Sequence, residues 1–296
     1  MRRYALSLLL PLLAIPGGWP HHVAIGLSDP PGDARALVRH APFDFRYQYL
    51  AGGVNTGHGW ATWNPAGSFV TLYVHESIAA RVTPVFTYYQ MLQGYLEQAR
   101  ATSLARSFAR RLIALRHELA PHALLAWHLS VWGTGEDPTY SKPSLARMDE
   151  LAARSAAFYE ALGAHFDLAF NDVTDRDAGF YRVIEGNPNT AWGPADFGRH
   201  DAYIAGFTRR THLPVVLWQL PLGNTTLNDT WGHFRDNRVQ WWLGSGSAAH
   251  LKATRDSGVI GLLFGGGAGG TTSAQTDGGL FFRLSSKYLA NPLTLR

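Results

Sequence analysis

The residues best suited to chemistry in this chain stand at the ends of short apolar runs. Residues 213–219 read Leu-Pro-Val-Val-Leu-Trp-Gln, a run that closes on Trp218 and Gln219 before Asn224 enters a polar loop. A short run without polar alternation predicts a strand buried on both faces, as in a parallel sheet between helices. In such sheets and barrels the loops beyond the carboxyl ends of the strands form the ligand site. The end of this run is therefore a candidate binding site.

Three other apolar runs, at residues 83–91, 123–132 and 166–173, end in the same way. If these strands are parallel, their carboxyl ends meet at one edge and their last side chains surround one pocket. Flat aromatic rings with amide and hydroxyl groups suit a neutral polyhydroxylated ligand such as a sugar. Any one ring has a plainer explanation, packing beneath a loop, but the set as a whole predicts a site. The candidate ligand-binding residues are Tyr88, Gln90, His128, Trp132, Asn171, Trp218, Gln219 and Asn224.

Carboxylates are concentrated at residues 171–177, at the end of one of these runs and in the loop after it. A glycosidase needs two carboxyl groups, about 5 Å apart for retention or roughly 6.5–9.5 Å apart for inversion. Asp172 is the first candidate for an acid or nucleophile. The second carboxylate is to be sought among Asp29, Glu136, Asp175 and Asp177, of which Asp177 is our choice. Asp177 also has the simpler option of pairing with Arg176 or capping a turn. Two functions stay open: glycoside-hydrolase-like chemistry, or sugar binding without catalysis.

Composition excludes several other kinds of site. The chain has no cysteine, which rules out disulfides, thiolate nucleophiles and Cys-ligated zinc. Its 13 histidines form no HExxH pattern or triplet at ligand spacing, so we expect neither a metal nor a cofactor. The net charge of +4 and pI near 9.4 come with no basic stripe interleaved with aromatics. We therefore expect no nucleic-acid partner. The expected ligand is the carbohydrate described above, and the expected oligomeric state is a monomer.

Strand-like and helix-like segments alternate along the 296 residues, which predicts βαβ units and a parallel sheet. A hydrophobic content of 46% is ample for one large core, so we expect a single-domain α/β barrel of TIM type. The clearest helix is at residues 103–120, where apolar residues recur every three or four positions (Leu104, Phe108, Leu112, Leu115 and Leu119). Strands are predicted at residues 22–29, 43–51, 83–91, 123–132, 166–173, 215–219 and 259–264. Helices are predicted at residues 33–40, 68–81, 103–120, 144–162, 196–211, 236–257 and 279–289.

The first residues resemble a secretory leader. Two arginines are followed by an apolar stretch at residues 4–15 and then by Pro16 and two glycines. The stretch is too short to span a bilayer comfortably, so no membrane span is expected. We predict a signal peptide at residues 1–20, a barrel domain at residues 21–296 and a secreted protein. The alternative is an N-terminal apolar strand or plug, since no Ala-x-Ala site is present.

Several stretches together resemble a group of secreted bacterial (β/α)-barrel proteins that are similar to glycoside hydrolases. The resemblance covers roughly residues 23 to 290 and implies a glycoside-hydrolase-like barrel. The stretches that carry it are FDFRYQYLAGGVNTGHGWATWNP, VTPVFTYYQMLQ, WHLSVWGTG, DVTDRDAGFY, LWQLPLGNTTLNDTWGHFRDNRVQWW and VIGLLFGGGAGGTT.

The resemblance also implies one more strand than this chain contains. In that group a further strand follows the one matching residues 83–91, and it ends in an acidic motif of the Val-Glu-Pro-Asp type. Here residues 91–97 lead directly into the helix predicted at 103–120, and seven strands are found in all. We therefore expect that one βα unit after the third strand is missing or degenerate. The loss of that acidic motif would leave the chain weak or inactive as a glycosidase.

Overall fold

A computed structural model shows the wall of the predicted barrel and much of the helical layer around it. The residues that it describes are 15–28, 31–32, 34–39, 43–51, 64–89, 98–119, 123–129, 145–172, 197–219, 248–264 and 280–295.

The seven strands of the described chain form one parallel sheet. Each strand pairs with the next in sequence, and β1 also pairs with β7, so the series of pairings returns to its start. The predicted parallel arrangement is confirmed. The strands are β1 (Ala24–Ser28), β2 (Phe45–Ala51), β3 (Thr83–Tyr89), β4 (Leu124–Leu129), β5 (Leu168–Asp172), β6 (Val215–Gln219) and β7 (Val259–Phe264).

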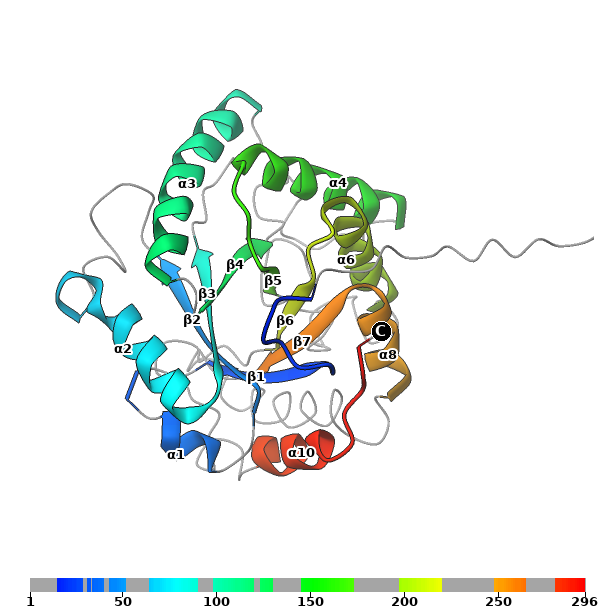
Figure 1. The fold of residues 1–296 in the computed structure, drawn as a ribbon. Coiled ribbons are helices and arrows are strands. Elements are labelled where there is room, and N and C mark those ends of the chain that lie inside the picture. The colour runs from blue at the N-terminus through cyan, green and yellow to red at the C-terminus, as the bar shows by residue number, and fades with distance from the viewer. Residues whose placement is uncertain are drawn as a thin grey trace, which may run out of the picture.

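The helices lie outside this ring of strands, as Figure 1 shows in a view along the barrel. Each strand from β2 to β6 is followed by at least one helix before the next strand begins. This is the βα alternation expected of a TIM-like fold. The helices are α1 (Ala34–Val38), α2 (Asn64–Ala80), α3 (Gln98–Leu119), α4 (Leu145–Leu162), α6 (Phe197–Thr211), α8 (Ala248–Asp256) and α10 (Leu280–Leu289).

Two helices begin earlier than the sequence pattern predicts. Helix α2 starts at Asn64 rather than at residue 68, because Asn64 and Pro65 supply the polar start and first-turn proline that favour a helix N-terminus. Helix α3 starts at Gln98 rather than at residue 103. The pattern missed this start because the first turn is polar and lies outside the apolar stripe. The stripe is confirmed at its last three positions, because Leu112, Leu115 and Leu119 are all buried.

Side chains from alternate positions of the strands form two separate apolar clusters. Phe45, Val85, Leu168 and Val216 belong to the cluster inside the ring. Their neighbours in sequence, such as Phe86, Ala169, Val215 and Leu217, belong to the larger cluster between the sheet and the helices. This is the alternation of inward and outward positions that a barrel strand imposes. The residues of the inner cluster therefore identify the inward positions of their strands.

No seam separates β3 from β4, the point after which a unit is expected to be missing. The two strands pair directly from Val85 with Leu124 to Tyr88 with Trp127. Loss of a unit would leave either a seam between these two strands or a tightened closure of the barrel. The pairing excludes the seam at this point, because the backbone groups of the two edges are bonded to each other. The loss of a unit itself stays a prediction.

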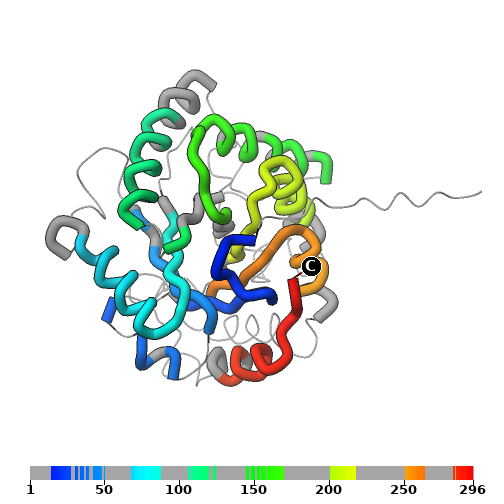
Figure 2. Tube along the Cα trace, in the orientation of Figure 1, coloured from blue at the N-terminus to red at the C-terminus, as the bar shows by residue number. Residues whose placement is uncertain are grey.

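A short segment before β1 crosses the middle of the ring, as the blue tube in Figure 2 shows. Its Trp19 is only 5% exposed and belongs to the inner cluster. The indole Nε1 donates a hydrogen bond to the carbonyl of Ile260 at 3.1 Å, and the ring centroid lies 5.0 Å from that of Phe45. Residues 15–20 thus form a buried segment inside the ring, directly after the apolar stretch at residues 4–15, of which the structure describes only Ile15.

The described part of the chain contains no helix with the length and hydropathy needed to cross a membrane.

Candidate functional site

The structure places six of the predicted site residues in the last or next-to-last positions of their strands. They are Tyr88 in β3, His128 in β4, Asn171 and Asp172 in β5, and Trp218 and Gln219 in β6. The other four, Gln90, Trp132, Asp177 and Asn224, lie outside the described residues.

The strand register brings the backbones of these residues to one edge of the sheet. Tyr88 pairs with Trp127, next to His128, and His128 pairs with Phe170. Asp172 then pairs directly with Trp218. Because all these pairs are parallel, Gln219 lies at the same end of the barrel as Asp172 and His128, as predicted. A ligand above this edge would meet three neighbouring strands, β4, β5 and β6.

The inner face of β3 carries a polar group that the sequence reading did not single out. Thr87 follows Val85 by two residues and is fully buried. Its hydroxyl has no hydrogen-bond partner among the residues that the structure describes. The run TPVFTYY contains the signal, since alternation from an inward Val85 puts Thr87 on the same face. Thr87 therefore adds a buried hydroxyl to the inner face of β3, two residues along the strand from the apolar Val85.

The polar contacts at the other end of the barrel have a clear structural role. His22 Nε2 lies 3.1 Å from Asp44 Oδ2, which also accepts the backbone N–H of Ile25 at 2.9 Å. Desolvation by burial raises the pKa of Asp44 above its ordinary value, and the hydrogen bond from Ile25 and the charge of His22 oppose that shift. The carboxylate joins the starts of β1 and β2, and it lies far along the strands from the predicted site.

Strand β2 is fastened to α2 by a fully buried arginine. The guanidinium of Arg46 lies 2.7 Å from Glu76 Oε1, donates to Ser77 Oγ at 3.0 Å and stacks 4.0 Å from the centre of the Tyr73 ring. Glu76 also accepts the N–H of Gly32 at 2.7 Å. A buried charge is tolerated only with such partners. These contacts face the helical layer, away from the inside of the ring.

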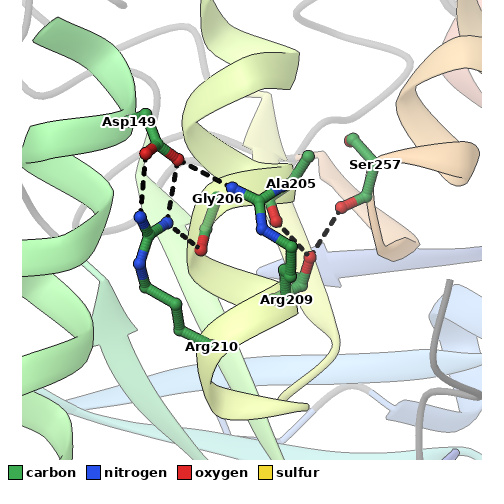
Figure 3. A network of polar contacts seen from close by, with 7 residues as sticks. Asp149, Ala205, Gly206, Arg209, Arg210 and Ser257 are labelled. Carbon is green, nitrogen blue, oxygen red and sulfur yellow. Dashed lines mark hydrogen bonds and ion pairs between the residues drawn. The ribbon is translucent and has the colours of Figure 1, made fainter. Parts of the chain in front are cut away.

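A second polar network joins α4 to α6 (Figure 3). Asp149 accepts two hydrogen bonds from Arg210 and one from Arg209, each of 2.8 Å. These bonds, with Arg210 as the largest cause, lower the pKa of Asp149. Gly206 allows the close approach, because a Cβ there would stand 2.8 Å from Ala152 Cβ. The network lies on the outer helices, so it supports the barrel and takes no part in the candidate site.

One buried carboxyl has a strongly shifted pKa. Burial raises the pKa of Asp201 on α6 to about 7, and a hydrogen bond from Thr254 on α8 at 3.1 Å opposes the shift. Thr254 is fully buried, so the pair lies in the interface between the two helices. The pair belongs to the helical layer outside the ring of strands. Within the described ranges, no three metal-ligating side chains come close enough together to hold an ion.

Comparisons with known proteins show similarity in structure only. No family model matches the chain, and no curated protein matches it. Similar solved structures include a Bacteroidetes-affiliated glycoside hydrolase family 5 cellulase linked with a polysaccharide utilization locus, at 9% identity over 92% of each chain with a TM-score of 0.48.

A glycoside hydrolase family 5 enzyme from Prevotella bryantii is similar at 9% identity and a TM-score of 0.47, over 90% of this chain and 96% of that one. Phosphoribosyl anthranilate isomerase from Thermococcus kodakaraensis is similar too, at 12% identity and a TM-score of 0.41, over 91% and 99% of the two chains. The similar structures thus include enzymes named for different activities.

Proposed function

We propose that the carboxyl ends of β4, β5 and β6 form a carbohydrate site of glycoside-hydrolase type. The observation that carries the proposal is the direct pairing of Asp172 with Trp218. It sets a carboxylate-bearing position beside an indole-bearing position at the edge where barrels of this kind bind their ligands. An aromatic face beside a carboxylate and amides suits a sugar ring with its hydroxyls.

The alternation of the strands sharpens the choice of residues. Leu168, Val216 and Leu124 belong to or pack against the cluster inside the ring. Counting by twos from them reaches positions 172, 218 and 128, so we assign the central roles to Asp172, Trp218 and His128. Asn171, Gln219 and Tyr88 fall on the alternate positions, and we expect them to act from the rim. In β3, the same count from Val85 reaches Tyr89 and not the predicted Tyr88.

Asp172 would act as acid or nucleophile, Trp218 would stack on a sugar ring, and His128 would bond hydroxyls. The partner carboxylate is the open question, with Asp177 as its candidate. If the βα unit after β3 is lost, as the resemblance implies, the acidic motif it carried is lost too. Without a second carboxylate, general acid assistance worth roughly 10²–10⁴ in rate is missing. The second candidate function, sugar binding without hydrolysis, follows from that loss.

Isothermal titration calorimetry with soluble oligosaccharides of several linkages tests binding. We expect one of them to bind and Trp218→Ala to weaken that binding roughly tenfold, as loss of an aromatic stack would. The matched control is Asp167→Asn, which removes a carboxylate just before β5, where Asp167 pairs with Arg116 at 2.8 Å. It should lower stability and leave affinity unchanged. Equal loss of affinity in both variants would remove the assignment of the site.

Hydrolysis of the bound glycan then separates the two candidate functions. We expect weak or no turnover in the wild-type protein. Robust hydrolysis that Asp172→Asn abolishes would show that a complete catalytic pair exists and that the missing unit has not removed it. Robust hydrolysis that survives in Asp172→Asn would contradict the catalytic role of that residue.

A further inference from the structure

Trp19 lies inside the ring of strands, against β7, in a space that fits an indole. A Cβ on Gly261 of β7 would stand only 2.9 Å from the indole atom Cζ2, and it would also press on Phe45 at 3.3 Å. A glycine at this point therefore leaves room for the ring. The hydrogen bond to Ile260 and the contact with Phe45 fix the ring on two further sides. Removing the ring would open a cavity at the centre of the inner cluster.

The chain just after Trp19 is bound to the C-terminal segment. Val23 N–H donates to the carbonyl of Leu293 at 2.8 Å, and Leu295 N–H donates to the carbonyl of His21 at 2.9 Å. Between them, His22 and Thr294 form an antiparallel bridge. Tyr288 of α10 adds a hydrogen bond from its hydroxyl to the carbonyl of Val23 at 2.9 Å. The N-terminal segment is therefore held by elements from the far end of the sequence.

The turn that leads into Trp19 is also part of this arrangement. Trp19 N–H donates to the carbonyl of Pro16 at 3.0 Å, and Gly18 adopts a positive φ of 84° that favours glycine. Ile15 packs against the inner cluster. The folded structure thus begins at residue 15 at the latest, inside the stretch that resembles a leader.

We propose that the folded domain needs residues 15–20 and does not need the residues before Ile15, so that any cleavage of the leader-like stretch falls before Ile15. A leader peptidase cuts after small residues. Ala14 is the small residue directly before Ile15, and Gly17 and Gly18 are the small residues beyond it. Cleavage after residue 20 would remove the indole and expose the apolar surfaces around Gly261 and Phe45. The structure therefore moves the boundary between leader and domain upstream of the one that the sequence suggests.

The first test uses the full chain in a bacterial host that exports proteins, with intact-mass measurement of the folded, purified product. We expect each folded species to begin at residue 15 or earlier, including the whole chain if it is not cut. A folded species with a cooperative thermal transition that begins at residue 21 or later would overturn the proposal.

The second test compares the full chain with two shortened chains, residues 15–296 and 21–296, each with an added initiating Met. We expect the longer chain to melt within about 2 °C of the full chain and the shorter one to melt roughly 10 °C lower, or not to fold, because a Trp is lost from the core. Equal melting temperatures of the two shortened chains would overturn the proposal. Failure of residues 15–296 to fold would do so as well, since the domain would then need residues before 15.

Discussion

The two ends of the strands in this barrel carry different kinds of residues. At the amino ends, Trp19 fills the ring, Asp44 joins β1 to β2, and residues 21–23 pair with the C-terminal segment. At the carboxyl ends, the sequence places indoles, amides and a carboxylate on neighbouring strands. In barrels the first kind of end supports stability and the second supports function. Substitutions at the amino ends should therefore change stability, and substitutions at the carboxyl ends should change ligand binding.

The largest loss of stability is expected for Trp19→Ala. It removes a buried indole and its hydrogen bond to Ile260, and it leaves a cavity over Gly261. Loss of a core Trp costs about 3–5 kcal/mol in the free energy of unfolding. Urea unfolding followed by circular dichroism measures it. The control Trp19→Phe keeps a ring and loses the hydrogen bond, so it should cost less; equal stability of Trp19→Ala and wild type would show that the indole adds nothing.

Asp201→Asn should change how stability depends on pH. The folded pKa of about 7 exceeds the ordinary 3.8, so the folded state binds the proton more tightly. The stabilisation that Asp201 contributes to the wild-type protein is therefore complete below about pH 4. It decreases as the pH rises from about 4 to about 7, and it is lost above about pH 7. At about 1.4 kcal/mol per pKa unit, the change is about 4 kcal/mol at most.

Asn cannot titrate, and its side-chain oxygen can still accept the hydrogen bond from Thr254. The free energy of unfolding of the variant should therefore rise relative to that of the wild type as the pH rises from 5 to 8. Urea unfolding at several pH values gives the comparison. A difference in stability between the two proteins that stays constant over this pH range would show that the carboxyl is ionised in the folded protein throughout it, which would contradict the raised pKa.

A methyl group on Gly26 should strain the inner layer. The Cβ of an alanine at this position would stand 2.1 Å from an atom of the Phe45 ring, so the ring has to move. Overpacking of this kind costs typically about 1–3 kcal/mol. Thermal unfolding of Gly26→Ala measures it, with Gly17→Ala as the control because nothing lies within 4 Å of a Cβ there. If both variants melt together, Phe45 does not pack against β1 as described.

The smallest effect is expected on the outer helices. Asp149→Asn weakens the ion pairs to Arg209 and Arg210, which are partly exposed, and pairs of that kind contribute about 0–1 kcal/mol. The lowered pKa of Asp149 means that its contribution is present above the unfolded pKa and is lost as pH falls through the folded one. The difference from wild type should therefore shrink in acid. A difference that grows in acid would contradict the direction of the shift.

Much of this fold could be predicted from local patterns. Apolar runs such as residues 215–219 and 259–264 appear as strands with those bounds, and the leucine stripe of α3 is buried. The helix start at Asn64 was missed because the apolar periodicity begins later than the capping signal. The role of Trp19 was missed because it rests on contacts with Ile260 and Phe45, and an apolar stretch after two arginines reads equally well as a leader.

The candidate site could also be predicted only in part. Parallel strands imply that their carboxyl ends share an edge, so the grouping of His128, Asp172 and Trp218 followed from sequence. Which residues of a strand face inward did not, because that parity depends on the packing of Leu168 and Val216 against distant strands. Thr87 was overlooked for the same reason.

Hydrogen–deuterium exchange with and without a bound oligosaccharide tests the division between the two ends most directly. We predict that the ligand slows exchange in peptides that contain residues 127–129, 170–172 and 217–219, and leaves residues 15–28 and 291–295 unchanged. Protection confined to the amino ends of the strands would contradict the account. A ligand that binds tightly without protecting β4, β5 or β6 would contradict it equally.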